Sequence, residues 1–228
     1  MTKYFITGTD TDAGKTVVSA GLLVLAARQG QRSLGLKPVA AGCQHTDDGL
    51  RNDDALALMA ASSEKIPYEL VNPIALEPPI APHIALMQQN RRVSVDQLAG
   101  YVRGAMMTPA DFVLIEGAGG WRVPLNRNQK MSDLPRCLAL PVIVVVGVKL
   151  GCISHALLTA EAITADGLQI AGWVGSIVDA DTRNTDEILM TLNALLEAPC
   201  LGVVPHLQDP GPELVANYLS LPPSLEQC

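Results

Sequence analysis

The sequence feature that most constrains this chain is the stretch Gly8–Thr16, which reads Gly-Thr-Asp-Thr-Asp-Ala-Gly-Lys-Thr. An apolar run at Tyr4–Ile6 precedes it, and an amphipathic run at Val17–Ala27 follows it. This order predicts a strand, a glycine-rich loop and a helix, the context in which such a loop cradles phosphate. Glycines let successive backbone N–H groups point into one concavity, and a helix start favours an anion. We therefore expect a phosphate-binding loop.

The side chains of this loop suit a nucleoside triphosphate. Lys15 can reach the outer phosphates, and the Thr16 hydroxyl can ligate magnesium. Five residues separate the two glycines, where the usual pattern has four, so Thr11 and Asp12 gain room to contact a ligand. The alternative is a glycine turn ahead of a solvated lysine, but the intact Gly-Lys-Thr and its flanks favour a nucleotide site.

The composition indicates one α/β domain over residues 1–228, with residues 220–228 as a loose tail. A chain of 228 residues is long enough for a central sheet covered on both faces. Hydrophobic residues make up 48% of the chain and aromatic residues only 4%, so we expect a core of Val, Leu, Ile and Ala. The net charge of −7 argues against broad affinity for nucleic acid or for anionic lipid.

Cysteine usage and hydropathy predict a cytoplasmic protein. The five cysteines are scattered, with no Cys-x-x-Cys pair, so reduced thiols are expected rather than a disulfide framework or a zinc site. No signal peptide is expected ahead of the first strand, which begins at Lys3. The longest apolar block, Pro141–Val148, is too short to span a membrane.

Apolar runs alternate with helical patterns along the chain. The continuous apolar run Val142–Val146 is typical of a strand buried on both faces of a parallel sheet. The alternation predicts a doubly wound α/β fold with a mainly parallel sheet flanked by helices, and the phosphate-binding loop makes it one of the P-loop NTPase type. The five prolines within Pro67–Pro82 predict an irregular excursion. The expected strands are Lys3–Thr7, Ser33–Lys37, Asp111–Glu116, Pro141–Gly147, Ile170–Ile177 and Cys200–Val204, and the expected helices are Gly14–Gln29, Asp53–Ala61, Val95–Met107, Ser154–Ala165, Thr185–Leu196 and Glu213–Leu219.

In such folds ligands collect at the carboxyl ends of the strands, so charged residues there are candidates for chemistry. Lys37 closes the second expected strand, beside the phosphate loop. Asp54 lies in the acidic start of a helix, a place that the helix dipole alone also favours. Glu116 closes a buried strand and is the kind of group that holds magnesium near a phosphate loop. The glycines of Gly117–Gly120 permit close approach of a ligand to the backbone.

Several motifs together resemble the dethiobiotin synthetase family. They occur between Thr2 and about Leu207 in the same order and spacing, so the resemblance covers nearly the whole chain. The phosphate loop alone is shared with many ATPases, whereas the combination with Lys37-Pro38-Val39 and the Val-Lys-Leu-Gly-Cys run is more specific. The motifs are Gly8–Thr16, Lys37–Val39, Gly49–Asn52 with Asp54, Glu116–Trp121, Val146–Ile153 and Ala171–Val174.

This resemblance implies an ATP- and Mg²⁺-dependent ligase of biotin biosynthesis that turns 7,8-diaminopelargonate and CO2 into dethiobiotin, ADP and phosphate. A substrate amine captures CO2 (or bicarbonate-derived CO2) as a carbamate, ATP converts it to a carbamic–phosphoric anhydride, and the second amine closes the ring. The resemblance implies that Lys15 and Lys37 hold the γ-phosphate and carbamate oxygens, with Thr11 at the junction of nucleotide and diamine. It assigns the magnesium to Thr16, Asp54 and Glu116.

The resemblance also implies which residues contact the ligands. Nucleotide contacts are expected from Asp12, Ala13, Gly14, Lys15, Thr16, Val17, Asp54, Glu116, Gly117, Ala118, Gly119, Ser176, Ile177, Pro205, His206 and Leu207. Diamine contacts are expected from Ala41 and from Gly151, Cys152, Ile153 and Ser154, the last four supplied by the partner in a homodimer with a shared active site.

Three positions depart from the family pattern. Ala41 stands where the family commonly has a serine, so one hydroxyl contact to the substrate is absent. Ser176 replaces an asparagine that reads adenine, and serine is too short for the paired contact of an amide. Ser154 replaces an asparagine near the expected substrate carboxylate.

A partitioning or membrane-switch ATPase is the alternative interpretation of the same loop. Such proteins typically carry a further lysine early in the loop, where this chain has Thr9–Thr11, and often a basic amphipathic tail, which the residues after Leu221 are not. A GTPase switch is disfavoured because no Asn-Lys-x-Asp motif follows Val146. An amidotransferase-type ligase would need a further glutaminase domain.

Overall fold

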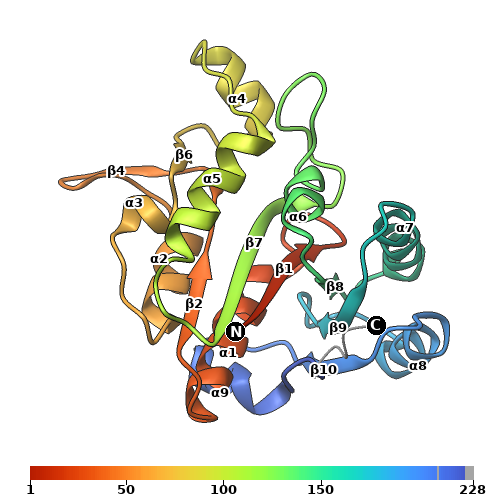
Figure 1. The fold of residues 1–228 in the computed structure, drawn as a ribbon. Helices are drawn as coiled ribbons and strands as arrows, with labels where there is room; N and C mark the ends of the chain where they lie inside the picture. Colours follow the sequence, from red (N-terminus) through yellow and green to blue (C-terminus); the bar gives the residue numbers. More distant parts are fainter. Residues whose placement is uncertain (210, 224–228) are drawn as a thin grey trace.

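A six-stranded parallel sheet forms the centre of the computed structural model, which describes residues 1–209 and 211–223 (Figure 1). The strand order is β10-β9-β8-β1-β7-β2, and each neighbouring pair is parallel. The expected doubly wound α/β fold is therefore confirmed. The strands are β1 (Thr2–Gly8), β2 (Ser33–Leu36), β7 (Phe112–Gly120), β8 (Val142–Gly147), β9 (Ile170–Ser176) and β10 (Cys200–Val204).

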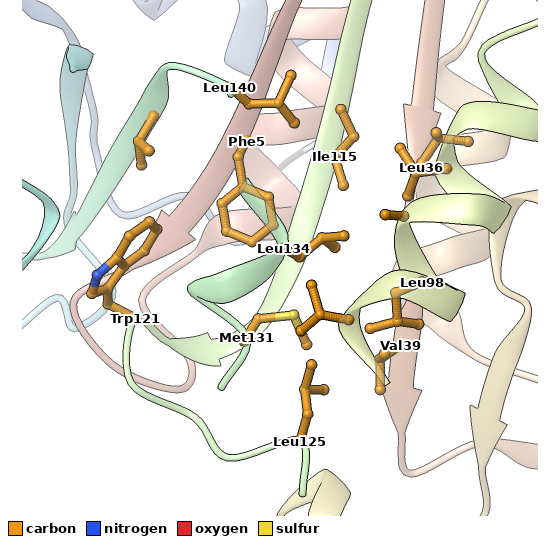
Figure 2. Packing of buried hydrophobic residues seen from close by; sticks show 14 of the residues in the cluster. Phe5, Leu36, Val39, Leu98, Ile115, Trp121, Leu125, Met131, Leu134 and Leu140 are labelled. Carbon is orange, nitrogen blue, oxygen red and sulfur yellow. The ribbon is translucent and has the colours of Figure 1, made fainter. Parts of the chain in front are cut away.

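Helices cover both faces of this sheet, because alternate residues of the central strands point to opposite sides. On one face, Tyr4 and Ile6 of β1 pack in a cluster with α1 (Lys15–Arg28), α2 (Asp53–Ala61) and α9 (Pro212–Val215). On the other face, Phe5 packs in the cluster shown in Figure 2. That second cluster includes residues of α5 (Val95–Ala105), α6 (Asp133–Leu138), α7 (Cys152–Ala165) and α8 (Thr185–Leu195).

The proline-containing stretch Pro67–Pro82 is ordered into elements, so its expected irregularity is wrong. It contains α3 (Tyr68–Val71) and β6 (Ile74–Leu76), and it leads into α4 (Pro82–Gln88). Its prolines lie where they are tolerated: Pro67 is the N-cap residue of α3, and Pro82 is at the start of α4. Strand β6 pairs in parallel with β3 (Val39–Ala41), while β4 (Gln44–Thr46) and β5 (Gly49–Arg51) form a hairpin.

Some expected boundaries are also corrected. Strand β7 does not end at Glu116 but continues to Gly120, because Gly120 still pairs with Gly8. Helix α7 begins at Cys152 rather than at Ser154, because Gly151 at φ 92° is its N-cap residue.

The expected helix Glu213–Leu219 is instead α9 followed by a short 3₁₀ helix, Ala216–Tyr218. Pairing of Leu219 with Gly202, and a Ser220 N–H bond to the Leu201 carbonyl, draw the chain away from a helix there.

The expected tail begins with packed residues, since Leu221 lies against the apolar cluster around α1. Residues 224–228 of that tail lie outside the described residues, and the single-domain assignment stays a prediction. Within residues 1–209 and 211–223, no helix is long and apolar enough to cross a membrane. The four cysteines in the same ranges are free thiols.

Candidate active site

The glycine-rich loop follows the carboxyl end of β1. Strand β1 lies between β7 and β8 in the sheet, and ligands of doubly wound folds bind at the carboxyl ends of such central strands. Its shape requires glycine at both ends. A Cβ added at Gly8 would lie 2.8 Å from the Asp10 carbonyl oxygen, and Gly14 has φ 86°. Gly14 is also the N-cap residue of α1 and offers no side-chain cap, so N–H groups of the first helical turn remain available to an anion.

Lys15 is buried and folded back across the loop. Its Nζ donates to the Asp10 carbonyl oxygen at 3.1 Å. Burial, followed by the charge of Lys37, lowers the pKa of Lys15 below its ordinary value of 10.5, although the nearby carboxylates of Glu116 and Asp54 oppose this shift. An ammonium held in this way has few partners of its own and is well placed to pair with an anion that enters the loop.

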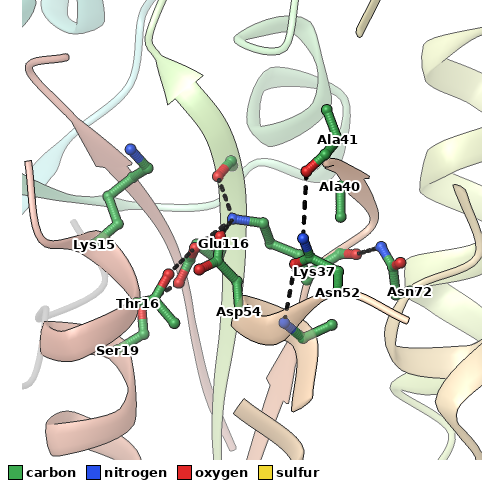
Figure 3. A network of polar contacts seen from close by, with 12 residues as sticks. Lys15, Thr16, Ser19, Lys37, Ala40, Ala41, Asn52, Asp54, Asn72 and Glu116 are labelled. Carbon is green, nitrogen blue, oxygen red and sulfur yellow. Dashed lines mark hydrogen bonds and ion pairs between the residues drawn. The ribbon is translucent and has the colours of Figure 1, made fainter. Parts of the chain in front are cut away.

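Lys37 lies just past the end of β2 and pairs with two carboxylates (Figure 3). Its Nζ is 2.8 Å from Asp54 Oδ2 and 2.5 Å from Glu116 Oε1, and it also donates to the Gly117 carbonyl oxygen at 3.4 Å. Lys37 is 4% exposed and Glu116 is 1% exposed, so this pair is withdrawn from water.

The pKa values of the two lysines in this site are shifted in opposite directions. Burial alone would lower the pKa of Lys37, but Glu116 and Asp54 outweigh burial and raise it above 10.5. Burial would likewise raise the pKa of Asp54, but the charge and hydrogen bond of Lys37 lower it below 3.8. Both shifts favour the charged forms of Lys37 and Asp54.

Two hydroxyls on the first turns of α1 complete the environment of Glu116. Thr16 donates to Oε1 and Ser19 donates to Oε2, each at 2.9 Å. Sequence reasoning anticipated Thr16 but missed Ser19. Ser19 could have been predicted from the sequence, because it lies three residues after Thr16 in the same helix and residues at this spacing share a helix face.

The oxygens of Thr16, Asp54 and Glu116 are hard donors of the kind that suit Mg²⁺. In the described part of the chain, no group of three or more His, Cys, Asp or Glu side chains is arranged to hold a metal ion. A magnesium ion at this place would therefore complete its shell with phosphate or water oxygens, as this ion commonly does.

A cleft of about 820 Å³ opens beside these residues. It brings together many of the predicted site residues: Thr11, Asp12, Gly14, Lys15, Thr16, Val17, Lys37, Ala41, Asp54, Ala118 and Gly119. Its other wall consists of residues that sequence reasoning missed: Ala40, Pro79, Ile80, Ala81, Pro82 and Val123. The available signal was the pair of short apolar runs Val39–Ala41 and Ile74–Leu76, whose pairing carries residues 79–82 to the cleft.

The predicted adenine-side residues do not line the cleft. Ser176, at the end of β9, packs so closely on the loop that a Cβ added at Gly14 would be 2.3 Å from its Oγ. The Ile177 N–H bonds to the Val204 carbonyl oxygen at 2.9 Å, which joins this segment to the one that contains Pro205 and His206. Leu207 packs against the same apolar cluster as Val17. Buried Ala13 and Glu116, with Gly117, lie behind the cleft surface.

The predicted diamine segment Gly151–Ser154 lines a different hollow, of about 570 Å³, at the start of α7. Ser154 is exposed there and does not cap the helix. Lys149 lines the same hollow, and its Nζ is 3.3 Å from Asp10 Oδ2, which links this region to the phosphate loop. Within one chain, therefore, residues 151–154 and the cleft are separate.

Comparison with known proteins identifies the family. The chain is 54% identical over 223 residues to the ATP-dependent dethiobiotin synthetase BioD of Cellvibrio japonicus, covering 98% of this chain and 97% of that protein. It is also 54% identical over 223 residues to the protein of the same name from Pseudomonas paraeruginosa, covering 98% of each chain. The chain belongs to the dethiobiotin synthetase family. This agrees with the resemblance of its motifs, and the chain is therefore placed among ATP-dependent ligases.

The wider fold of this dethiobiotin synthetase family member is shared with solved structures of other proteins. A family model described as an AAA domain matches residues 2–213. Chloroplast FtsY from Physcomitrella patens superposes with a TM-score of 0.57 at 16% identity, over 96% of this chain and 62% of that one. The septum site-determining protein MinD from Pyrococcus horikoshii, complexed with Mg-ADP, gives a TM-score of 0.55 at 16% identity, over 93% and 86%. At these identities the likeness shows the fold alone.

Proposed function

We propose that this chain converts 7,8-diaminopelargonate, CO2 and ATP into dethiobiotin, ADP and phosphate in the cytoplasm. The observation that carries the proposal is the convergence of two buried lysines, Thr16 and Asp54 on one cleft beside the phosphate loop, with Glu116 bonded to Lys37 and Thr16 directly behind it. The names of its close relatives support the same reaction.

The chemistry needs positioning and charge neutralisation rather than a protein nucleophile. One amine of the diamine bonds to CO2 and loses a proton, which leaves a carbamate. A carbamate oxygen attacks the γ-phosphorus of ATP, and ADP leaves. The second amine then attacks the carbamate carbon and loses a proton, and phosphate leaves with the oxygen that joined it to carbon and takes up that proton. Lys15 and Lys37 neutralise the oxygens that gain charge, and Thr11 lies where nucleotide and diamine meet.

Magnesium fits the oxygen set of Thr16, Asp54 and Glu116. When bound, it neutralises charge on the transferring phosphate and helps to orient it. Glu116 is already fixed for this role by the hydroxyls of Thr16 and Ser19. The chain's own contribution is thus a carboxylate held in a fixed position beside the phosphate loop before the nucleotide enters.

The base is read beside the start of α1 by Ser176, Ile177, Pro205, His206 and Leu207. The contact of Ser176 with Gly14 supports this placement, because it sets the end of β9 against the loop. A serine hydroxyl offers one short donor or acceptor, whereas an amide offers both at once. Phosphate and metal contacts therefore supply most of the affinity for ATP.

The working unit is a homodimer in which the partner's residues 151–154 hold the carboxylate of the diamine. Support comes from the exposed apolar side chains around this segment: Leu150 is 97% exposed and Leu158 is 61% exposed. The start of α7 also lacks a side-chain cap, so its N–H groups can bind a carboxylate. In this arrangement Ala41 of one subunit lines the middle of the diamine site.

The experiment that tests the function uses purified protein with the diamine, ¹³C-bicarbonate, Mg²⁺ and ATP. Dethiobiotin carrying one ¹³C atom is expected by mass spectrometry, and the Lys37→Met variant serves as the matched control. ATP hydrolysis without dethiobiotin would overturn the proposal.

A further inference from the structure

The ammonium group of Lys37 has no donor left for a substrate. An ammonium group has three N–H donors, and Lys37 Nζ contacts three acceptors: Asp54 Oδ2, Glu116 Oε1 and the Gly117 carbonyl oxygen. A lysine that must hold a carbamate or a phosphate oxygen has to give up at least one of these partners first.

Two of those partners are oxygens of Asp54 and Glu116, the carboxylates that the proposed metal site uses. Glu116 Oε1 accepts from Lys37 and from Thr16 at the same time. A divalent cation bound to Thr16, Asp54 and Glu116 would place two positive charges where the ammonium now lies. Cations only a few ångströms apart in a buried site repel strongly, so both cannot keep these oxygens.

We infer that Lys37 occupies the divalent-cation position in the ligand-free protein and is displaced into the cleft when Mg²⁺ binds. This inference rests on the proposed function and deepens it. The lysine acts first as a stand-in that pairs with both carboxylates and offsets part of their charge. It becomes available to the substrate only once the metal has arrived, so metal–nucleotide binding precedes engagement of the carbamate by Lys37.

The surroundings allow the lysine to move while its partner stays in place. Glu116 is tied by Thr16 and Ser19 on both oxygens. The backbone of Lys37 is also fixed, because its N–H donates to the Val71 carbonyl oxygen and its own carbonyl accepts from Asn72 Nδ2 at 2.6 Å. Its flexible side chain lines the cleft, so it can swing out of the carboxylate pair without moving the sheet.

Metal affinity without nucleotide gives the first test. Mn²⁺ alone is titrated into the wild-type protein and into Lys37→Met, and the free ion is followed by electron paramagnetic resonance. Removal of the competing ammonium should tighten Mn²⁺ binding by about tenfold or more. Lys15→Met is the matched control, because Lys15 is also buried nearby but donates to a backbone carbonyl instead. Equal effects in the two variants, or weaker binding in Lys37→Met, would overturn the inference.

Chemical labelling of the wild-type protein gives a second test that does not depend on a variant folding. Acetylation of Lys37 by acetic anhydride is measured by mass spectrometry in EDTA and in Mn²⁺, relative to exposed Lys130. Displacement predicts that labelling of Lys37 rises several-fold in Mn²⁺, and unchanged labelling at saturating Mn²⁺ would contradict displacement. Neither test uses ATP or the diamine, so their failure would overturn the displacement alone, and the dethiobiotin assay would still decide the function separately.

Discussion

Glu116 is the residue at which the polar contacts of the site meet. A carboxylate this deeply buried needs partners, and it accepts from Thr16, Ser19 and Lys37. The Lys37–Glu116 ion pair is therefore part of a connected hydrogen-bond network beside the phosphate loop, unlike an isolated ion pair on the surface. Substitutions in this network should affect turnover more strongly than substitutions of exposed charges.

We predict that Lys15→Ala, Lys37→Ala and Glu116→Ala each lower kcat by about a hundredfold or more. Loss of one electrostatic contact made in the transition state typically costs about 3 kcal/mol. Lys37→Ala should keep most of its affinity for the nucleotide, because its partner is mainly the carbamate. Steady-state kinetics and ADP titration measure both quantities, with Lys130→Ala as an exposed control. Near-normal turnover of Lys37→Ala would refute the role of this lysine.

Ser176 leads to a prediction about base selectivity. Without the paired contact of an amide, the penalty for a wrong base falls, so CTP and GTP should support turnover better than a strict adenine site allows. The measurement is kcat/KM for ATP, CTP and GTP. A preference for ATP beyond about a thousandfold would mean that other groups read the adenine.

At the scale of elements, the long strands and helices were predictable, whereas the short ones were not. Val142–Val146 is apolar throughout, and a run of this kind leaves little choice but a doubly buried strand. Val39–Ala41 and Ile74–Leu76 are too short to show any periodicity, and only their mutual pairing makes them strands. The same limit applies to the site, because motifs revealed Lys15, Lys37 and Glu116, but the cleft wall at residues 79–82 depends on that tertiary pairing.

The starts of β2 and β7 are joined by an ion pair whose strength depends on pH. Arg32 donates to both carboxylate oxygens of Asp111 from its side chain, and its backbone N–H adds a further bond. The side-chain hydrogen bond from Arg32, followed by that backbone bond, lowers the pKa of Asp111 from 3.8 to about 2. A depressed folded-state pKa stabilises the fold above pH 3.8, and this contribution is lost as the pH falls towards 2.

We predict that Asp111→Asn lowers the free energy of unfolding modestly at pH 7, since the pair is exposed. The difference from wild type should shrink between about pH 4 and pH 2, where the native carboxylate itself becomes protonated. Urea unfolding at several pH values measures this, with Asp96→Asn as a control on the exposed face of α5. A difference that stays constant through this pH range would show that the pair acts through packing alone.

At the scale of the whole molecule, the cleft and the hollow at residues 151–154 are separate surfaces of one chain. A diamine with a long acid tail must contact both if its amines are to reach the phosphate and its carboxylate is to reach the α7 N-terminus. A second subunit that presents its own 151–154 segment meets this requirement, and it would cover the exposed Leu150.

Mixing two inactive variants tests the shared site. Lys15→Ala damages the phosphate loop, and Ser154→Trp blocks the start of α7 at an exposed position. In a mixed dimer one shared site carries both lesions and the other carries neither, so activity should return towards about a quarter of wild type after random assortment. If mixed dimers form and activity stays absent, the carboxylate site belongs to the same chain as the cleft.

The proposed function depends above all on one step, in which a carbamate oxygen bonds to the γ-phosphorus of ATP in this cleft. The most direct measurement of that step uses C¹⁸O2 in unlabelled water with the diamine, Mg²⁺ and ATP, quenched within the first turnovers before the label exchanges. We predict that the released phosphate carries one ¹⁸O atom for each dethiobiotin formed, because the carbamate oxygen leaves with phosphorus. Phosphate whose new oxygen comes only from water would contradict this step, since ATP would then be hydrolysed without activating the carbamate.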